Sequence, residues 1–218
     1  MGLFDVREAN KASREAQGFT MRPMTALPPA PGDDLHPALE LANTLQTTPA
    51  GTADLIANPE SATAWLSQRE LLTEGISLGR PCATRLLDLR DAVRALLAGV
   101  IGQQQPPETA LAVVNAALIA VPTADLLAWD TGRGLHRSAR HPLDRATAHL
   151  LAVIAVDAVD LLTGPDAAKL AACGAPRCSR FLLRTHAARQ WCSVRCGDRV
   201  RAARAYARRG MSTGARTL

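Results

Sequence analysis

Four cysteines near the C-terminus limit what this chain can fold into more than any other feature. Their spacing is Cys173-x4-Cys178-x13-Cys192-x3-Cys196. Two close pairs separated by a short insert are the pattern of a tetrahedral four-cysteine zinc site, because one tight turn supplies each pair of thiolates and the insert can bring the two pairs together. The sequence therefore predicts one Zn²⁺ per chain, bound by these four cysteines.

The segment that holds these cysteines is too short to fold by hydrophobic burial alone. About 38 residues, 173–210, cannot bury a sufficient core, so metal binding is the expected source of the folding free energy. Free thiols or a pair of disulfides are the alternative state of the cysteines. Four thiolates also leave no open coordination position for water, which argues against a catalytic zinc.

We expect the residues around the metal to form a small treble-clef-like zinc finger. The residues inside the first cysteine pair, GAPR, favour a tight turn. The insert RFLLRTHAARQW, residues 180–191, is predicted to form a β-hairpin with Phe181 and Trp191 in a small core beside the metal. A helix then begins near Val194, and its first turn supplies the last two ligands.

Charge divides the chain near residue 170. Residues 1–170 have a net charge of −5, whereas residues 171–218 hold 11 Arg and a single acid, Asp198, which gives +10. Such a division is typical of a basic module that binds a polyanion and is attached to an acidic body. An arginine bias of a GC-rich genome, or a basic face that is simply solvated, is the simpler alternative.

Helical spacing places three arginines of the last helix on one face: Arg201, Arg204 and Arg208. An adjacent apolar stripe, which can lie against the hairpin or the body, comprises Val200, Ala203 and Ala207. Because only 3% of the residues are aromatic, double-stranded DNA is a better-matched partner than single strands, whose bases stack on aromatic rings. The residues expected to contact DNA are Arg184, Arg189, Arg195, Arg201, Arg204 and Arg208.

Residues 36–170 are predicted to form a mainly α-helical body with one β-hairpin. Asn58 and Pro59 suit the N-cap and first position of one helix, and Asp130–Gly132 suits the hairpin turn. Apolar residues recur at helical steps over residues 82–102, 106–121 and 141–162. The expected core residues are Trp65, Leu66, Leu86, Leu89, Val93, Leu96, Leu97, Val100, Leu143, Leu150, Ile154 and Leu161.

The ends of the chain are predicted to lack regular structure. Residues 1–35 are rich in turn formers, which predicts a disordered tail or the product of a mis-assigned start codon. Residues 211–218 are predicted to form a flexible tail. Between them, the apolar faces of residues 36–170 should let the body fold without the finger. With no signal peptide and no membrane-spanning apolar run, a cytoplasmic protein is expected, where reducing conditions favour metal binding over disulfides.

Several segments resemble a known family. CGAPRC…WCSVRCGDR resembles the CGNR zinc finger, and HPALELANTL, LLDLRDAVRALL and HLLAVIAVDAVDLLTGPDAAKLAAC resemble the ABATE domain that precedes this finger in stress-induced transcriptional regulators. The resemblance covers about residues 36–210, with the ABATE-like domain at 36–170 and the finger at 171–210. It implies a zinc-dependent DNA-binding transcription regulator, whose body senses a small-molecule effector or forms a homodimer.

One position departs from the family pattern. Asp198 stands where the family name has Asn, and its carboxylate suits a helix N-terminus but repels a phosphate. Arg199 matches the pattern and is a further candidate DNA contact. The departure puts a direct DNA contact at residue 198 in doubt.

Other readings remain open at this stage. A zinc-stapled adaptor could dock an acidic protein on the basic face. Asn43, Thr44 and Arg90 either satisfy buried backbone groups or contact the effector. An enzyme is disfavoured, because no nucleophile–base order, paired carboxylates or glycine-rich phosphate loop stands out.

Overall fold

The computed structural model describes residues 27–49, 51–72, 75–121, 126–138 and 146–214. Within these residues the chain forms a helical body and three two-stranded antiparallel sheets. In chain order the elements are α2 (Pro37–Asn43), β1 (Leu45–Thr48), β2 (Gly51–Asp54), α3 (Pro59–Gln68), α4 (Arg80–Gly102), α5 (Glu108–Ala120), β3 (Leu126–Asp130), β4 (Gly134–Ser138), α6 (Ala146–Thr163), the 3-10 helix η2 (Ala167–Lys169), β5 (Leu170–Ala172), β6 (Phe181–Leu183) and α7 (Val194–Gly214). No helix in this part of the chain combines the length and apolarity that a membrane crossing requires.

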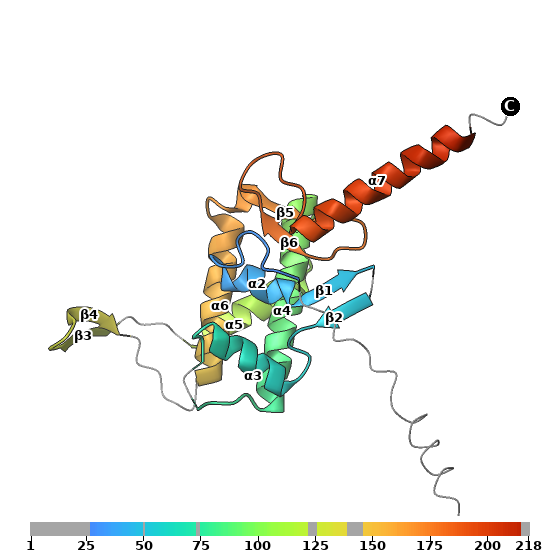
Figure 1. Cartoon of the computed structure of the whole chain (residues 1–218). Coiled ribbons are helices and arrows are strands. Elements are labelled where there is room, and N and C mark those ends of the chain that lie inside the picture. The colour runs from blue at the N-terminus through green and yellow to red at the C-terminus, as the bar shows by residue number, and fades with distance from the viewer. Residues whose placement is uncertain (1–26, 50, 73–74, 122–125, 139–145, 215–218) are drawn as a thin grey trace, which may run out of the picture.

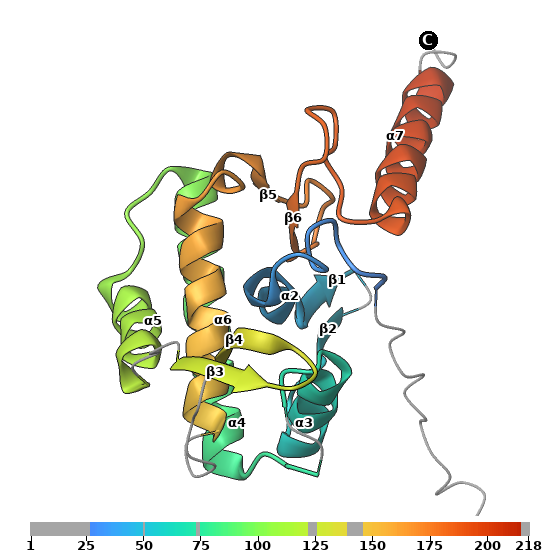
Figure 2. The same ribbon diagram turned by 90° about the vertical axis from the view of Figure 1, so that its left-hand side faces the viewer.

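The body is built around the two long helices α4 and α6, with α2, α3 and α5 packed around them (Figures 1 and 2). The predicted apolar positions of α4 are buried except Val100, which lies near its C-terminal end and is 39% exposed. In α6, Leu150, Ile154 and Leu161 are buried as predicted. The predicted start of this helix, including Leu143, lies outside the described residues.

Local signals in the sequence predicted the ends of several elements. Asn58 caps α3: its side chain accepts a hydrogen bond from the Ser61 N–H at 2.8 Å, and the Ser61 hydroxyl accepts one from the Asn58 N–H at 3.2 Å. The reciprocal pair satisfies two N–H groups at the helix end. In the β3–β4 hairpin, the Asp130 carboxylate accepts hydrogen bonds from the turn N–H groups of Gly132 and Arg133.

The body holds a second hairpin that the sequence analysis did not predict. Strand β1 pairs with β2, from Leu45 opposite Asp54 to Thr48 opposite Gly51. The signals for it were two threonines at the end of β1 and the turn formers Pro49 and Gly51. They were too short to stand out, because each strand has only four residues.

The prediction that residues 180–191 form a hairpin is wrong. Strand β6 instead pairs with β5, which lies before the first cysteine, so that Leu170 stands opposite Leu183. Because side chains alternate along a strand, Leu170, Phe181 and Leu183 join the core of the body, whereas Ala171 and Leu182 join a second core around the cysteines. The two-stranded sheet β5–β6 is therefore a wall shared by the body and the finger.

This wall changes the expectation that residues 36–170 fold alone. A chain that ends at residue 170 is cut inside the β5–β6 sheet and loses Phe181 and Leu183 from the core of the body. From this packing we now expect that residues 36–170 do not fold independently, which a melting experiment can test.

Both predicted tails contain ordered residues. Residues 27–35 pack on the finger, with Ala30 and Asp33 buried and the Leu183 N–H donating to the Pro31 carbonyl at 2.8 Å. At the other end, α7 runs to Gly214, so residues 211–214 are helical. Residues 1–26 and 215–218 lie outside the described residues.

Candidate metal centre and basic helix

The four cysteine sulfurs meet in one cluster, although they come from two separate stretches of chain, residues 173–178 and 192–196. All four Sγ atoms lie within 4.8 Å of one another. The distances are 3.7 Å from Cys178 to Cys192, 3.6 Å from Cys192 to Cys196 and 3.8 Å from Cys196 to Cys178. A zinc ion about 2.3 Å from each sulfur places tetrahedral sulfurs about 3.8 Å apart. The residues therefore fit a Zn²⁺ ion.

The local fold supports this cluster. A tight turn follows Cys173, in which the Cys178 N–H donates to the Ala175 carbonyl at 3.1 Å and Arg177 takes a left-handed conformation. The Cys192 N–H donates to the Cys173 sulfur at 3.3 Å, and the Arg199 guanidinium to the Cys196 sulfur at 3.7 Å. Such donors offset the excess negative charge of four thiolates around one divalent cation.

Hydrogen bonds among the thiols shift their pKa values in opposite directions. Hydrogen bonds from Cys178 and Cys192 lower the pKa of Cys173 to about 2. The hydrogen bond to Cys173 in turn raises the pKa of Cys178 to about 11, and the pKa of Cys192 is raised in the same way. Four neighbouring thiolates therefore need a cation between them, and binding of the cation releases protons.

Polar side chains join the finger to the body. The Asn43 amide donates to the Phe181 carbonyl at 3.0 Å and accepts from the Phe181 N–H at 2.8 Å, as an added strand would. Arg180 and Asp33 form an ion pair at 3.0 Å, with side chains only 2% and 3% exposed. Arg94 donates to the Ala42 and Ser179 carbonyls and lies over the Phe181 ring.

The three candidate effector contacts have structural partners. Asn43 bonds the backbone of β6, and the Thr44 hydroxyl donates to the Leu41 carbonyl at 2.7 Å. Arg90 pairs with Asp54 at 2.7 Å and with Asp91 at 3.0 Å. The contacts of Asn43 and Thr44 match the alternative that these side chains satisfy buried backbone groups, whereas Arg90 pairs with carboxylates.

Sequence reasoning missed Arg94, Arg180 and Asp33. A signal existed for Arg94, which stands one helical turn after Arg90 on the face of α4 that also carries buried leucines. The other two lie 147 residues apart in the sequence, so that no local pattern connects them.

Helix α7 leaves the finger and extends away from the rest of the protein (Figures 1 and 2). Of its predicted apolar stripe, Val200 is buried against the cysteine core, whereas Ala203 and Ala207 are exposed. Only the first residue of the stripe is therefore buried against the finger.

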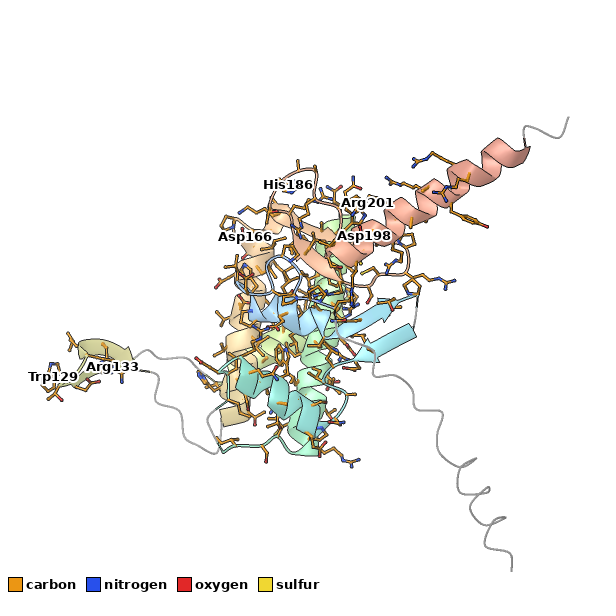
Figure 3. All side chains as sticks on the ribbon, viewed as in Figure 1. Trp129, Arg133, Asp166, His186, Asp198 and Arg201 are labelled. Carbon is orange, nitrogen blue, oxygen red and sulfur yellow. The ribbon has the colours of Figure 1, made fainter. Side chains whose placement is uncertain are left out.

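The arginines of α7 divide into two groups. At the base of the helix, Arg201 pairs with Asp198 at 2.5 Å and lies over the Trp191 ring, 5.7 Å from its centroid (Figure 3). Further along, Arg204 and Arg208 are exposed and have no ion pair or hydrogen bond to their side chains within the described residues.

The remaining candidate DNA contacts differ in their surroundings. Arg184 and Arg195 are exposed, and Arg189 is half-buried. Arg199 donates to the Pro176 carbonyl at 3.2 Å and to the Cys196 sulfur, so it also holds the cysteine turn against α7.

A helical body, a four-cysteine metal centre and a basic helix that begins at this centre together define a zinc-finger protein. Residues 35–165 match the family described as "ABATE: Putative stress-induced transcription regulator", and residues 169–209 match the CGNR zinc finger. The chain belongs to this ABATE family, which is one of transcription regulators and not of enzymes. A search of curated proteins found no match to the chain.

Proposed function

We propose that this protein is a zinc-dependent transcription regulator that binds double-stranded DNA through α7 and the adjoining finger. The observation that carries the proposal is the pair Arg204 and Arg208 on α7, which are exposed and have no acidic partner within the described residues. In a chain whose first 170 residues are net acidic, these guanidinium groups are left for a partner outside the molecule.

The geometry of α7 suits a duplex. The segment after Val200 has 14 residues, which span about 21 Å as a helix, and the major groove is about 12 Å wide and admits one α-helix. The metal centre fixes the start of the helix, since Cys196 lies in its first turn. Less conformational freedom is then lost when the helix binds.

Zinc has a structural role in this proposal. One Zn²⁺ per chain, bound by the four cysteines, would hold the turn after Cys173 and the base of α7 in one place. We also place the protein in the cytoplasm, where reduced thiols remain available to the metal.

DNA binding by the zinc-loaded protein tests the proposal. Fragments selected from genomic DNA should share a sequence, and affinity for that sequence should fall as salt rises, because bound counterions are released from the phosphates. Affinity that is absent at low salt, or equal for every duplex, would contradict sequence-specific regulation through this helix.

One observation favours a second candidate function. An apolar groove of about 590 Å³ lies between the finger and α7, lined by Pro49, Pro176, Val200, Ala203 and Ala207, with arginines 177, 199 and 204 among its lining residues. A groove of this kind suits an acidic amphipathic helix of a partner protein, as in an adaptor. Replacing Ala203 and Ala207 with Glu would weaken such docking, and the loss of DNA binding after changes to Arg204 and Arg208 would favour DNA instead.

A further inference from the structure

A second pocket lies on the finger, between the loop that follows β6 and the first turns of α7. Its volume is about 240 Å³. The side chains that give it chemical character are His186, Arg189, Trp191, Ser193 and Arg201, and Gly197 forms part of its wall. Figure 3 shows His186 in the loop and Arg201 near the base of α7. The described residues that line this pocket include no acid, although Asp198 pairs with Arg201 beside it.

Arg189 lacks an acceptor in this pocket. Its side chain is half-buried, and its Nε atom is fully covered without a hydrogen-bond partner within the described residues. The Arg189 backbone N–H donates to the His186 carbonyl at 3.0 Å, which closes the turn that brings both side chains to the pocket. The Arg189 side chain also has no ion pair or hydrogen bond within the described residues, so its positive charge lacks a counter-ion. The covered Nε atom is out of reach of a ligand, but the guanidinium lines the pocket, where an anion from outside the chain can neutralise it.

Arg201 and Trp191, which form the opposite side of the pocket, are held in place by contacts within the chain. Asp198 and the Trp191 ring fix the Arg201 guanidinium. A Cβ atom at Gly197 would lie 3.1 Å from both Arg201 Nη1 and Trp191 Cε3, so glycine permits their close approach. Preorganised guanidinium groups favour phosphate, because the fork of N–H donors matches its oxygens.

We propose that this pocket binds one phosphate group, and that the phosphate belongs to the backbone of the DNA duplex. The assignment to DNA rests on the proposed function, whereas the phosphate chemistry rests on the pocket alone. Since the pocket adjoins the base of α7, a phosphate held there would fix where the helix enters the groove. Such contacts set register and orientation without reading sequence.

The test of the phosphate chemistry uses Arg189→Ala and Arg184→Ala in the full-length, zinc-loaded protein. Arg184 is a matched control: it lies on the same loop, is exposed, does not line the pocket and carries the same charge. Inorganic phosphate, titrated at constant ionic strength, should change the tryptophan fluorescence of the wild type and of Arg184→Ala. The response should disappear in Arg189→Ala and in Trp191→Phe, with zinc content unchanged in each variant.

Duplex binding distinguishes the two sources of phosphate. Arg189→Ala should lower affinity for the selected duplex about tenfold, as expected when a hydrogen bond to a charged group is removed, and more than Arg184→Ala does. Inorganic phosphate should compete with the duplex. A phosphate response with equal duplex affinity in wild type and Arg189→Ala would overturn the assignment to DNA.

Two other outcomes are decisive. No response of the wild type to phosphate, or an equal loss in both arginine variants, would overturn the pocket while leaving DNA binding by α7 intact. A phosphate response in a protein that binds no duplex at all would support the phosphate site, and would contradict both the proposed function and the DNA source.

Discussion

Helices α4 and α7 both carry arginines, and the two sets have opposite surroundings. On α4, Arg90 is 4% exposed and pairs with two carboxylates, and Arg94 donates to backbone carbonyls of the body and the finger. On α7, Arg204 and Arg208 are exposed and lack partners within the described residues. The difference lies in the acceptors within reach, since the chain after residue 170 holds one acid. Arg90 and Arg94 of α4 therefore serve the fold, whereas Arg204 and Arg208 of α7 are available to a ligand.

The largest effect should come from removing the metal on which α7 depends. Cys196→Ser should abolish stoichiometric zinc binding, unfold the finger and eliminate DNA binding, because metal binding in small zinc modules contributes about 10–16 kcal/mol. Metal analysis and circular dichroism measure this. Cys82→Ser, at the half-buried cysteine of α4, should retain one zinc; loss of zinc there would show that ligand assignment by spacing is wrong.

Removing the finger and α7 from the body that contains α4 should also have a large effect on cooperative folding. Residues 36–170 contain α4 but lack Phe181 and Leu183, so we expect no cooperative melting of this fragment. A fragment of residues 27–214 supplies the comparison and should melt in one transition. A sharp, native-like transition of the shorter fragment would mean that the β5–β6 wall is dispensable to the body.

Single arginine substitutions should then separate fold from binding. Arg94→Ala removes a guanidinium that joins the body to the finger and leaves the Ala42, Leu45 and Ser179 carbonyls each with one donor fewer. The free energy of unfolding should therefore fall by about 2–4 kcal/mol. Arg204→Ala should change it by less than about 0.5 kcal/mol. Chemical denaturation measures both, and equal effects would remove the contrast between the helices.

The reverse contrast is expected in DNA binding. Arg204→Ala/Arg208→Ala should lower the slope of log affinity against log salt by about two units, because each arginine that neutralises one phosphate accounts for about one unit. The matched control is Arg80→Ala/Arg85→Ala, which removes the same charge from exposed positions of α4. An unchanged slope in the α7 variant, with zinc retained, would favour the acidic protein partner.

The smallest effect concerns an ion pair of the body. Burial acts to lower the pKa of His36, but its hydrogen bonds to Asp157 at 2.8 Å and Asp166 at 3.3 Å outweigh burial and raise the pKa above its ordinary 6.5. The protonated form is therefore stabilised in the folded state, and its contribution is complete below pH 6.5 and is lost as pH rises through the raised pKa.

Substituting this histidine tests the expected sign. Wild-type stability should fall between about pH 6 and pH 8 relative to His36→Gln, in paired denaturation curves. A difference that grows with pH would contradict the ion pair. The affinity for DNA should be the same in the wild type and in His36→Gln, because His36 lies on the body.

The sequence predicted those features that short-range patterns encode. The apolar steps of α4, the cap at Asn58 and the cysteine spacing each involve residues within one element or one small module. The pairing of β5 with β6 could not be predicted in this way, because three-residue strands carry no usable periodicity and their partner is chosen by packing on a distant core. The ion pair of Asp33 with Arg180 depends on the same long-range packing.

If Zn²⁺ occupies the four-cysteine site as proposed, the shared β5–β6 sheet makes the stability of the whole chain depend on the free zinc concentration. Ligand that binds only the folded state raises the free energy of unfolding in proportion to the logarithm of its concentration above the dissociation constant. Because β6 contributes side chains to both cores, this gain is not confined to the finger and reaches the helices of the body. The fraction of folded protein then depends on the free zinc concentration. Zinc depletion makes both the body and the basic helix susceptible to proteolysis.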